Sequence, residues 1–163
     1  MKINSKKTVI LIIVAILVVA IAVASLAIIF GGGDFRRAKW GMSPNEVKSR
    51  ENGELVTDSE YRLTFRTDNL EGVPVETNIF YSFDGGNGLW QVSMGYGMEG
   101  FDDKLADRII KAFVEKYGEE DEYDETQTAY EYYWKNDRTE IRISQQQTYL
   151  LVSFTDINYV IED

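Results

Sequence analysis

The chain contains neither histidine nor cysteine. Without histidine it lacks the side chain that most often acts as a general base near neutral pH, which excludes histidine-dependent catalytic triads. Without cysteine there is no disulfide, no thiol nucleophile, no lipidated cysteine and none of the usual zinc sites. These absences exclude most hydrolase mechanisms, and we expect neither a metal site nor a cofactor.

Positive charge is scarce over most of the chain. All 27 acidic residues but only 14 of the 17 basic residues follow Gly33, so residues 34–163 carry a net charge of −13. Because phosphate binding requires a basic surface, the composition argues against nucleic acid as a partner. The exception is the locally basic stretch 36–50. It fits either contact with anionic lipid headgroups or ordinary charge beside a membrane segment.

Long apolar runs are absent except for one, from Thr8 to Phe30, which has 23 residues and no charge. A helix of that length spans a hydrocarbon core of about 30 Å. The run predicts a transmembrane signal-anchor at residues 8–30, after a short cytoplasmic head and before a glycine joint that ends at residue 33. The basic residues on both sides do not decide orientation, but long domains translocate largely regardless of flanking charge. We therefore expect a single-pass cell-membrane protein with residues 34–163 as one extracytoplasmic domain.

A cleaved signal peptide is the alternative for the same segment. Three lysines precede the run, and Ala22-Val23-Ala24 fits a small-x-small cleavage site. The run is longer than the hydrophobic part of a typical signal peptide, which favours the uncleaved anchor.

Two helices are expected in the domain. Ser43, Pro44 and Glu46 form a capping-box pattern and predict a short helix that ends near Asn52-Gly53. A second helix begins at Asp102 or Asp103 and ends at Gly118, a residue typical of helix ends. Its predicted apolar face carries Leu105, Ile109, Ile110, Phe113, Val114 and Tyr117.

Alternation of apolar and polar residues predicts six strands, three after each helix. They are centred on residues 61–65, 75–83, 90–98, 130–134, 141–143 and 150–154. The segments 43–98 and 102–157 have the same length, 56 residues, and the same order of elements. We therefore predict an α+β fold of two α-β-β-β units that form an antiparallel sheet with the helices on one face.

A family resemblance rests mainly on the stretch Trp40-Gly41-Met42-Ser43-Pro44-Asn45-Glu46-Val47. Phe35, Lys116-Tyr117-Gly118, Trp134 and Thr139-Glu140-Ile141-Arg142-Ile143 add to it. The chain resembles small exported bacterial envelope modules that open with W-G-M-S-x-x-E-V. Their fold is similar to that of outer-membrane-assembly lipoproteins of the SmpA/OmlA type and of β-lactamase inhibitory protein. The resemblance implies protein binding without catalysis. The missing lipobox cysteine argues against the outer-membrane lipoprotein role, and no inhibitor contact residue can be matched.

Acidic side chains are the only abundant groups with catalytic or metal-binding chemistry. Two carboxyls across a cleft could serve a glycosidase, but no spacing among the 27 acidic residues selects a pair. The run 119–125 has six carboxylates and could bind calcium, yet it lacks the glycine and the ligand spacing of an EF-hand loop. Asp84 and Asn87, in the glycine-rich segment 84–88, are explained by a tight turn. A solvated acidic connection is the preferred interpretation of 119–125.

Several aromatic and arginine side chains alternate out of phase with the apolar residues of the predicted strands. These residue types are enriched at binding hot spots, and the phase places them away from the helices. A cover by another part of the chain, or a register shifted by one residue, would explain them without binding. The candidate binding residues are Phe80, Tyr133, Tyr149, Leu151, Arg62, Arg66 and Arg142.

Three hypotheses follow for the function. The first is a tethered, non-catalytic binding module for an envelope protein or peptide, and it is the one we favour. The second is a carboxylate-dependent enzyme acting on cell-wall polymer. The third is a structural or sensory domain whose anchor self-associates through the small-residue pair Ala20 and Ala24. The sequence does not define an oligomeric state.

Overall fold

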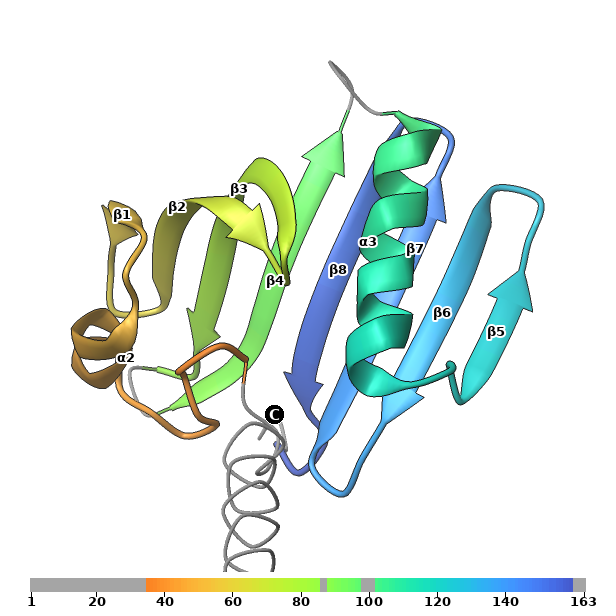
Figure 1. Ribbon diagram of the computed structural model, residues 1–163. Coiled ribbons are helices and arrows are strands. Elements are labelled where there is room, and N and C mark those ends of the chain that lie inside the picture. The colour runs from red at the N-terminus through yellow and green to blue at the C-terminus, as the bar shows by residue number, and fades with distance from the viewer. Residues whose placement is uncertain (1–34, 86–87, 98–101, 160–163) are drawn as a thin grey trace, which may run out of the picture. The chain divides into compact units, whose positions relative to one another are not determined.

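The computed structural model describes residues 35–85, 88–97 and 102–159, which form an α+β fold with an eight-stranded antiparallel sheet and two helices (Figure 1). The helices are α2 (Pro44–Arg50) and α3 (Asp103–Tyr117). The strands are β1 (Glu54–Asp58), β2 (Arg62–Leu70), β3 (Val73–Phe83), β4 (Leu89–Gly97), β5 (Glu122–Glu125), β6 (Ala129–Lys135), β7 (Thr139–Gln146) and β8 (Tyr149–Asp156).

The predicted membrane segment, residues 8–30, lies outside the described residues. In the part of the chain that the structure describes, neither helix is long and apolar enough to cross a membrane.

Both helices begin and end close to the predicted residues. The Ser43 hydroxyl accepts a hydrogen bond from the Glu46 backbone N–H at 3.4 Å, and the Glu46 carboxylate accepts one from the Ser43 N–H at 2.9 Å. This is the predicted capping box. Helix α3 begins after the N-cap Asp102 and ends at Gly118, whose φ of 89° is the left-handed conformation that favours glycine.

The sheet has the strand order β1-β2-β3-β4-β8-β7-β6-β5 (Figure 1). Strands β1 to β4 form one meander and β5 to β8 another, and the two meanders join where β4 pairs with β8. One row of cross-strand partners runs through all eight strands on the side that faces α3. It consists of Leu55, Phe65, Ile79, Met94, Val152, Ile143, Tyr132 and Tyr123.

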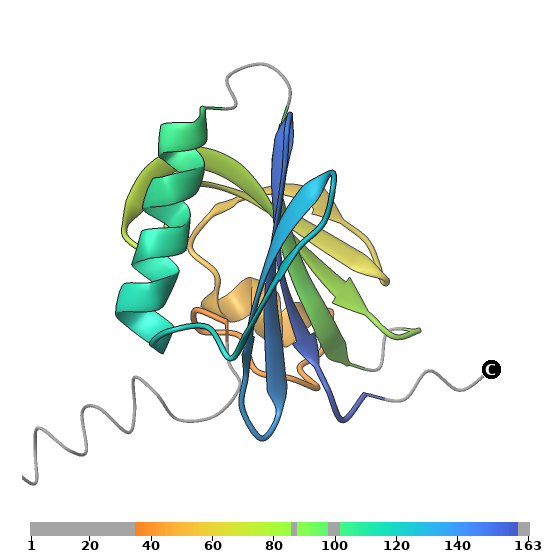
Figure 2. The same ribbon diagram turned by 90° about the vertical axis from the view of Figure 1, so that its right-hand side faces the viewer.

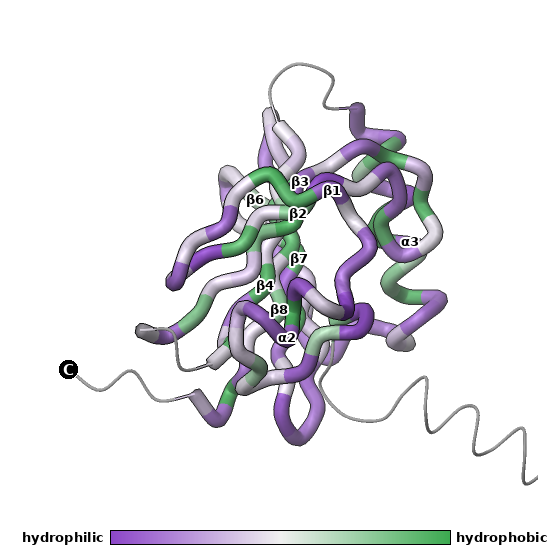
Figure 3. The backbone as a smooth tube through the Cα atoms, turned by 90° about the vertical axis from the view of Figure 1, so that its left-hand side faces the viewer, coloured by the Kyte–Doolittle hydropathy of each residue, from purple (hydrophilic) through white to green (hydrophobic). Residues whose placement is uncertain are grey.

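The core lies between this side of the sheet and the helices. Figure 2 shows α3 on one side of the sheet, and Figure 3 shows hydrophobic residues along the strands and along part of α3. Ile109 and Phe113 of α3 and Val47 of α2 are fully buried in the same cluster as the inward-facing strand residues. Trp40, which precedes α2, packs into this cluster, and its indole N–H donates to the Thr139 hydroxyl at 2.8 Å.

The structure corrects the predicted number of strands from three to four in each half. The missed strands, β1 and β5, are the two edges of the sheet, and all of their residues are exposed. An exposed edge strand needs no apolar alternation, so the pattern that reveals the inner strands is absent. In particular, residues 122–125 of the acidic run are a strand rather than part of a solvated connection.

The first residues of two predicted strands, Trp90 and Tyr61, lie outside the core. The pairing of β3 with β4 has an irregularity at Trp90, so Leu89 takes the buried position and Trp90 stacks on Tyr159 with ring centres 5.2 Å apart. A β-bulge of this kind shifts the alternation by one residue. Tyr61 lies just before β2 and is 60% exposed.

Candidate functional site

The candidate site is the side of the sheet that faces away from α3, which we call the outer face. A row of cross-strand partners defines it: Thr64, Phe80, Ser93, Ser153, Arg142 and Tyr133. Because side chains alternate along a strand, Arg62 and Arg66 share this face with Thr64, and Tyr149 and Leu151 share it with Ser153. The structure thus places all seven candidate residues on one face, from five strands.

The candidate residues differ in exposure. Tyr149 is 37% exposed and Leu151 is 41% exposed, although both are large and largely apolar. The three arginines are exposed, whereas Phe80 and Tyr133 are half-buried. Exposed apolar and aromatic side chains beside arginine are typical of a binding surface.

Two arginine–aromatic pairs stand at opposite ends of the outer face. The Arg62 guanidinium carbon is 6.0 Å from the centre of the Phe80 ring, and that of Arg142 is 5.7 Å from the Tyr133 ring. Both distances are in the range of cation–π contacts. The first pair bridges β2 and β3 and the second bridges β7 and β6, so their midpoints are four strand spacings, about 19 Å, apart. The small side chains of Ser93 and Ser153 lie between them.

A buried carboxylate holds Arg142 in place. The Arg142 Nε and Nη2 donate to the two carboxylate oxygens of Glu131 at 2.8 and 3.1 Å, and the Ser144 hydroxyl donates to the same carboxylate at 2.8 Å. Burial raises the pKa of Glu131, but the hydrogen bonds from Arg142 and Ser144 outweigh it and hold this pKa below its usual value. The bond to Glu131 also raises the pKa of Arg142. The guanidinium is therefore a fixed positive charge on this face.

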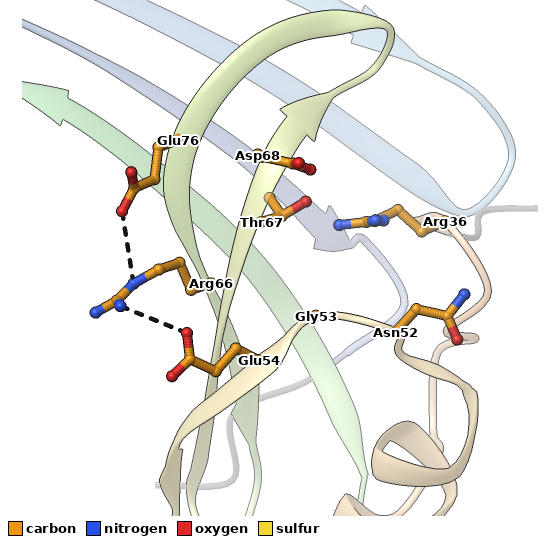
Figure 4. Close-up of a pocket in the computed structure, with 8 residues that line it drawn as sticks. All are labelled: Arg36, Asn52, Gly53, Glu54, Arg66, Thr67, Asp68 and Glu76. Atoms are coloured by element: carbon orange, nitrogen blue, oxygen red, sulfur yellow. Dashed lines mark hydrogen bonds and ion pairs between the residues drawn. The ribbon is translucent and has the colours of Figure 1, made fainter.

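Arg66 belongs to a different environment, a pocket of about 460 Å³ where β1, β2 and β3 meet the turn before α2 (Figure 4). It lies between the carboxylates of Glu54 and Glu76, at 3.4 and 3.8 Å. Arg36 points into the same pocket toward Thr67 and has an ion pair with Glu51 at 3.7 Å. Because both arginines already have carboxylate partners, a ligand would have to displace an ion pair to bind either of them.

Sequence reasoning missed two residues of these sites. Glu131 has the same alternation phase as Tyr133, which was a signal for its place on the outer face, but its pairing with Arg142 depends on the register of β6 and β7. Arg36 was interpreted only as membrane-proximal charge. Its left-handed backbone, with φ of 55°, turns the chain and aims the side chain at the pocket, and no residue pattern predicts that conformation for an arginine.

Comparisons with known proteins add little to this geometry. No protein-family model and no curated protein matches the chain. One solved structure, a DUF4309 family protein (YjgB) from Bacillus subtilis, is similar at 11% sequence identity and a TM-score of 0.40. The match covers 77% of this chain and 82% of that one. A likeness at this level carries no argument about function.

Proposed function

We propose that the protein is a membrane-anchored, non-catalytic binding module of the bacterial envelope whose outer face contacts an envelope protein or peptide. The observation that carries the proposal is the gathering of exposed Tyr149, exposed Leu151 and two arginine–aromatic pairs on the face opposite α3. The anchor is residues 8–30, and the domain 34–163 lies outside the cytoplasm. This part of the proposal rests on the sequence alone.

We further propose that the domain is a duplicated α-β-β-β-β unit, with four strands in place of the three expected in each half. The strand order is consistent with an approximate two-fold relation between the halves, because each meander contributes one edge and one central strand. Under this relation β2 and β3 correspond to β6 and β7, so each half contributes one arginine–aromatic pair. A partner would then meet two similar contact points about 19 Å apart.

The carboxylate-enzyme alternative is less well supported. A general acid requires a carboxyl with a raised pKa, which burial without a cationic partner would produce. Four carboxylates whose side chains are less than a tenth exposed each have a positively charged partner. The pairs are Glu51 with Arg36, Glu71 with Lys116, Glu131 with Arg142 and Asp156 with Arg138. This pairing favours a structural role for them.

Affinity capture from envelope extract tests the proposed function. The full-length chain should retain a specific partner, and Tyr149→Ala combined with Leu151→Ala should weaken capture by about 1–3 kcal/mol, the scale of hot-spot residues. Tyr61→Ala is the matched control, because Tyr61 is an exposed tyrosine, at 60%, that lies just before β2 rather than on β8. If the double variant melts like the unmodified protein and captures the same partner equally well, the outer face is not the binding surface.

A further inference from the structure

Helix α3 leaves the helix side of β5 and β6 uncovered. It lies over β7 and β8, and β6 and β5 extend beyond it (Figure 1). The cross-strand row shows the consequence: Val152 and Ile143 are fully buried, whereas the next member, Tyr132, is half-buried and the last, Tyr123, is 46% exposed. Tyr130 is on the same side and is 43% exposed. We call Tyr123, Tyr130 and Tyr132 the tyrosine strip.

The tyrosine strip has a fixed geometry. The rings of Tyr123 and Tyr132 are 5.2 Å apart, and Tyr132 stacks on the buried Trp134 at 6.5 Å with nearly parallel planes. Trp134 is in turn held by a 2.8 Å hydrogen bond from its indole N–H to the Gly118 carbonyl. A cavity of about 290 Å³ adjoins Tyr130, and another of about 160 Å³ adjoins Trp134. Tyr130 thus lines the first cavity, and Trp134, on which Tyr132 stacks, lines the second.

The chain segment that carries most of the strip is rich in negative charge. The sequence has seven carboxylates and no lysine or arginine between Lys116 and Lys135. Burial, neighbouring tyrosines and the carboxylates of Glu120 and Asp107 raise the pKa of Tyr132. Aromatic faces attract cations, and the nearby carboxylates attract positively charged groups as well.

Strand β5 is also an open edge of the sheet. Among the described residues β5 pairs only with β6. The 2.9 Å hydrogen bond from the Thr126 N–H to the Ala129 carbonyl shows which residues of β5 direct their backbone groups toward β6. By alternation, Glu122 and Asp124 bond to β6, while the backbone N–H and C=O groups of Tyr123 and Glu125 point to the open side. The sequence of β5, Glu-Tyr-Asp-Glu, would place carboxylates against carboxylates if two copies paired through it. A strand with lysine or arginine side chains would instead place positive charges against these carboxylates, which favours pairing.

We propose that the β5 edge and the tyrosine strip bind an extended cationic segment of a partner protein, which pairs with β5 and lays lysine or arginine side chains over the rings. The segment becomes a ninth strand, bonded to the backbones of Tyr123 and Glu125. Its side chains on the helix side contact the tyrosine strip, and those on the outer side meet Glu122 and Asp124. The β5 edge and the tyrosine strip lie apart from Tyr149, Leu151 and the two arginine–aromatic pairs, so the two proposals are tested by different variants.

Fluorescence anisotropy with a defined peptide tests this site. The full-length chain in a non-ionic detergent is titrated against a labelled eight-residue peptide of alternating lysine and threonine. A peptide with glutamate in place of lysine is the charge control, and a lysine peptide N-methylated at alternate backbone amides is the strand-pairing control. We expect the lysine peptide to bind, the two control peptides not to bind, and affinity to fall as salt is raised.

Variants locate the site on the domain. Tyr123→Ala combined with Tyr130→Ala should weaken binding of the lysine peptide roughly tenfold, since two exposed cation–π contacts are lost. Tyr61→Ala, just before β2, should leave binding unchanged. Circular dichroism melting curves verify that each variant is folded. If the double alanine variant unfolds, the double variant Tyr123→Phe and Tyr130→Phe takes its place; it keeps both rings and should bind the lysine peptide as the unmodified protein does.

Several results would overturn the proposal. These are equal binding of the glutamate peptide, undiminished binding of the N-methylated peptide, an equal loss with Tyr61→Ala, and no binding at all. Sedimentation that shows dimers disrupted by Tyr123→Ala would also overturn it, because a second copy would then occupy the edge.

Discussion

Replacing Glu131 by glutamine should destabilise the domain at neutral pH. The substitution keeps the size of the side chain but removes the charge, and the new amide group places a donor against the donors of Arg142. The carboxylate accepts two hydrogen bonds from Arg142 and one from Ser144. Hydrogen bonds to charged groups contribute about 1.5–3 kcal/mol, but the Arg142 side chain is 48% exposed and regains water contacts. We therefore expect a loss of about 1–2 kcal/mol.

The pH dependence of the stability loss distinguishes loss of the charged hydrogen bonds from a packing defect. Because the pKa of Glu131 is lowered in the folded protein, its stabilising contribution is complete above the ordinary glutamate pKa of about 4.3. The contribution is lost as the pH falls through the lowered value. Thermal melting should show Glu131→Gln lower in Tm by about 3–10 °C at pH 7, and the gap should narrow below about pH 4.

The control for this experiment is Glu60→Gln, which removes the same charge from an exposed position between β1 and β2. It should leave the melting temperature within about 2 °C of the unmodified protein, as surface substitutions usually do. A gap for Glu131→Gln that stays constant from pH 7 to pH 3, or no gap at pH 7, would refute the role of the charged hydrogen bonds.

Two further predictions concern the helix start and the membrane anchor. Ser43→Ala removes the acceptor for the Glu46 backbone N–H and should lower the free energy of unfolding by about 0.5–2 kcal/mol in urea titrations, with Ser49→Ala as a control on the same helix. An unchanged transition midpoint would show that the cap contributes nothing. Protease added to intact spheroplasts should degrade residues 34–163 while 8–30 stays in the membrane, and protection until lysis would place the domain in the cytoplasm.

The helices and inner strands were predictable because their signals are local. A capping box needs only Ser43 and Glu46, three residues apart, and a helix N-cap and C-cap need only Asp102 and Gly118. Alternation over five or more residues likewise reports the two faces of a strand without knowledge of its neighbours. For the same reason the seven candidate residues could be assigned to the side opposite the helices.

The edge strands and the pairings at the sites depend on segments far apart in the chain. Strands β1 and β5 exist because one neighbouring strand supplies their hydrogen bonds, and their exposed side chains carry no periodic signal. Tyr130 is exposed because α3 does not lie over this part of the sheet. The sequence of β6 contains no pattern that indicates this.

The α+β class, the approximate helix boundaries, the strongly acidic domain and the phase of the inner strands can all be predicted from the amino-acid sequence, since each depends on residues close together in the chain. The tertiary structure alone decided that β4 pairs with β8 and that Trp40 bonds to Thr139 across 99 residues. It also decided that Glu131 meets Arg142. These contacts are set by strand register and by packing between the two halves, and register is a property of paired strands rather than of either strand alone.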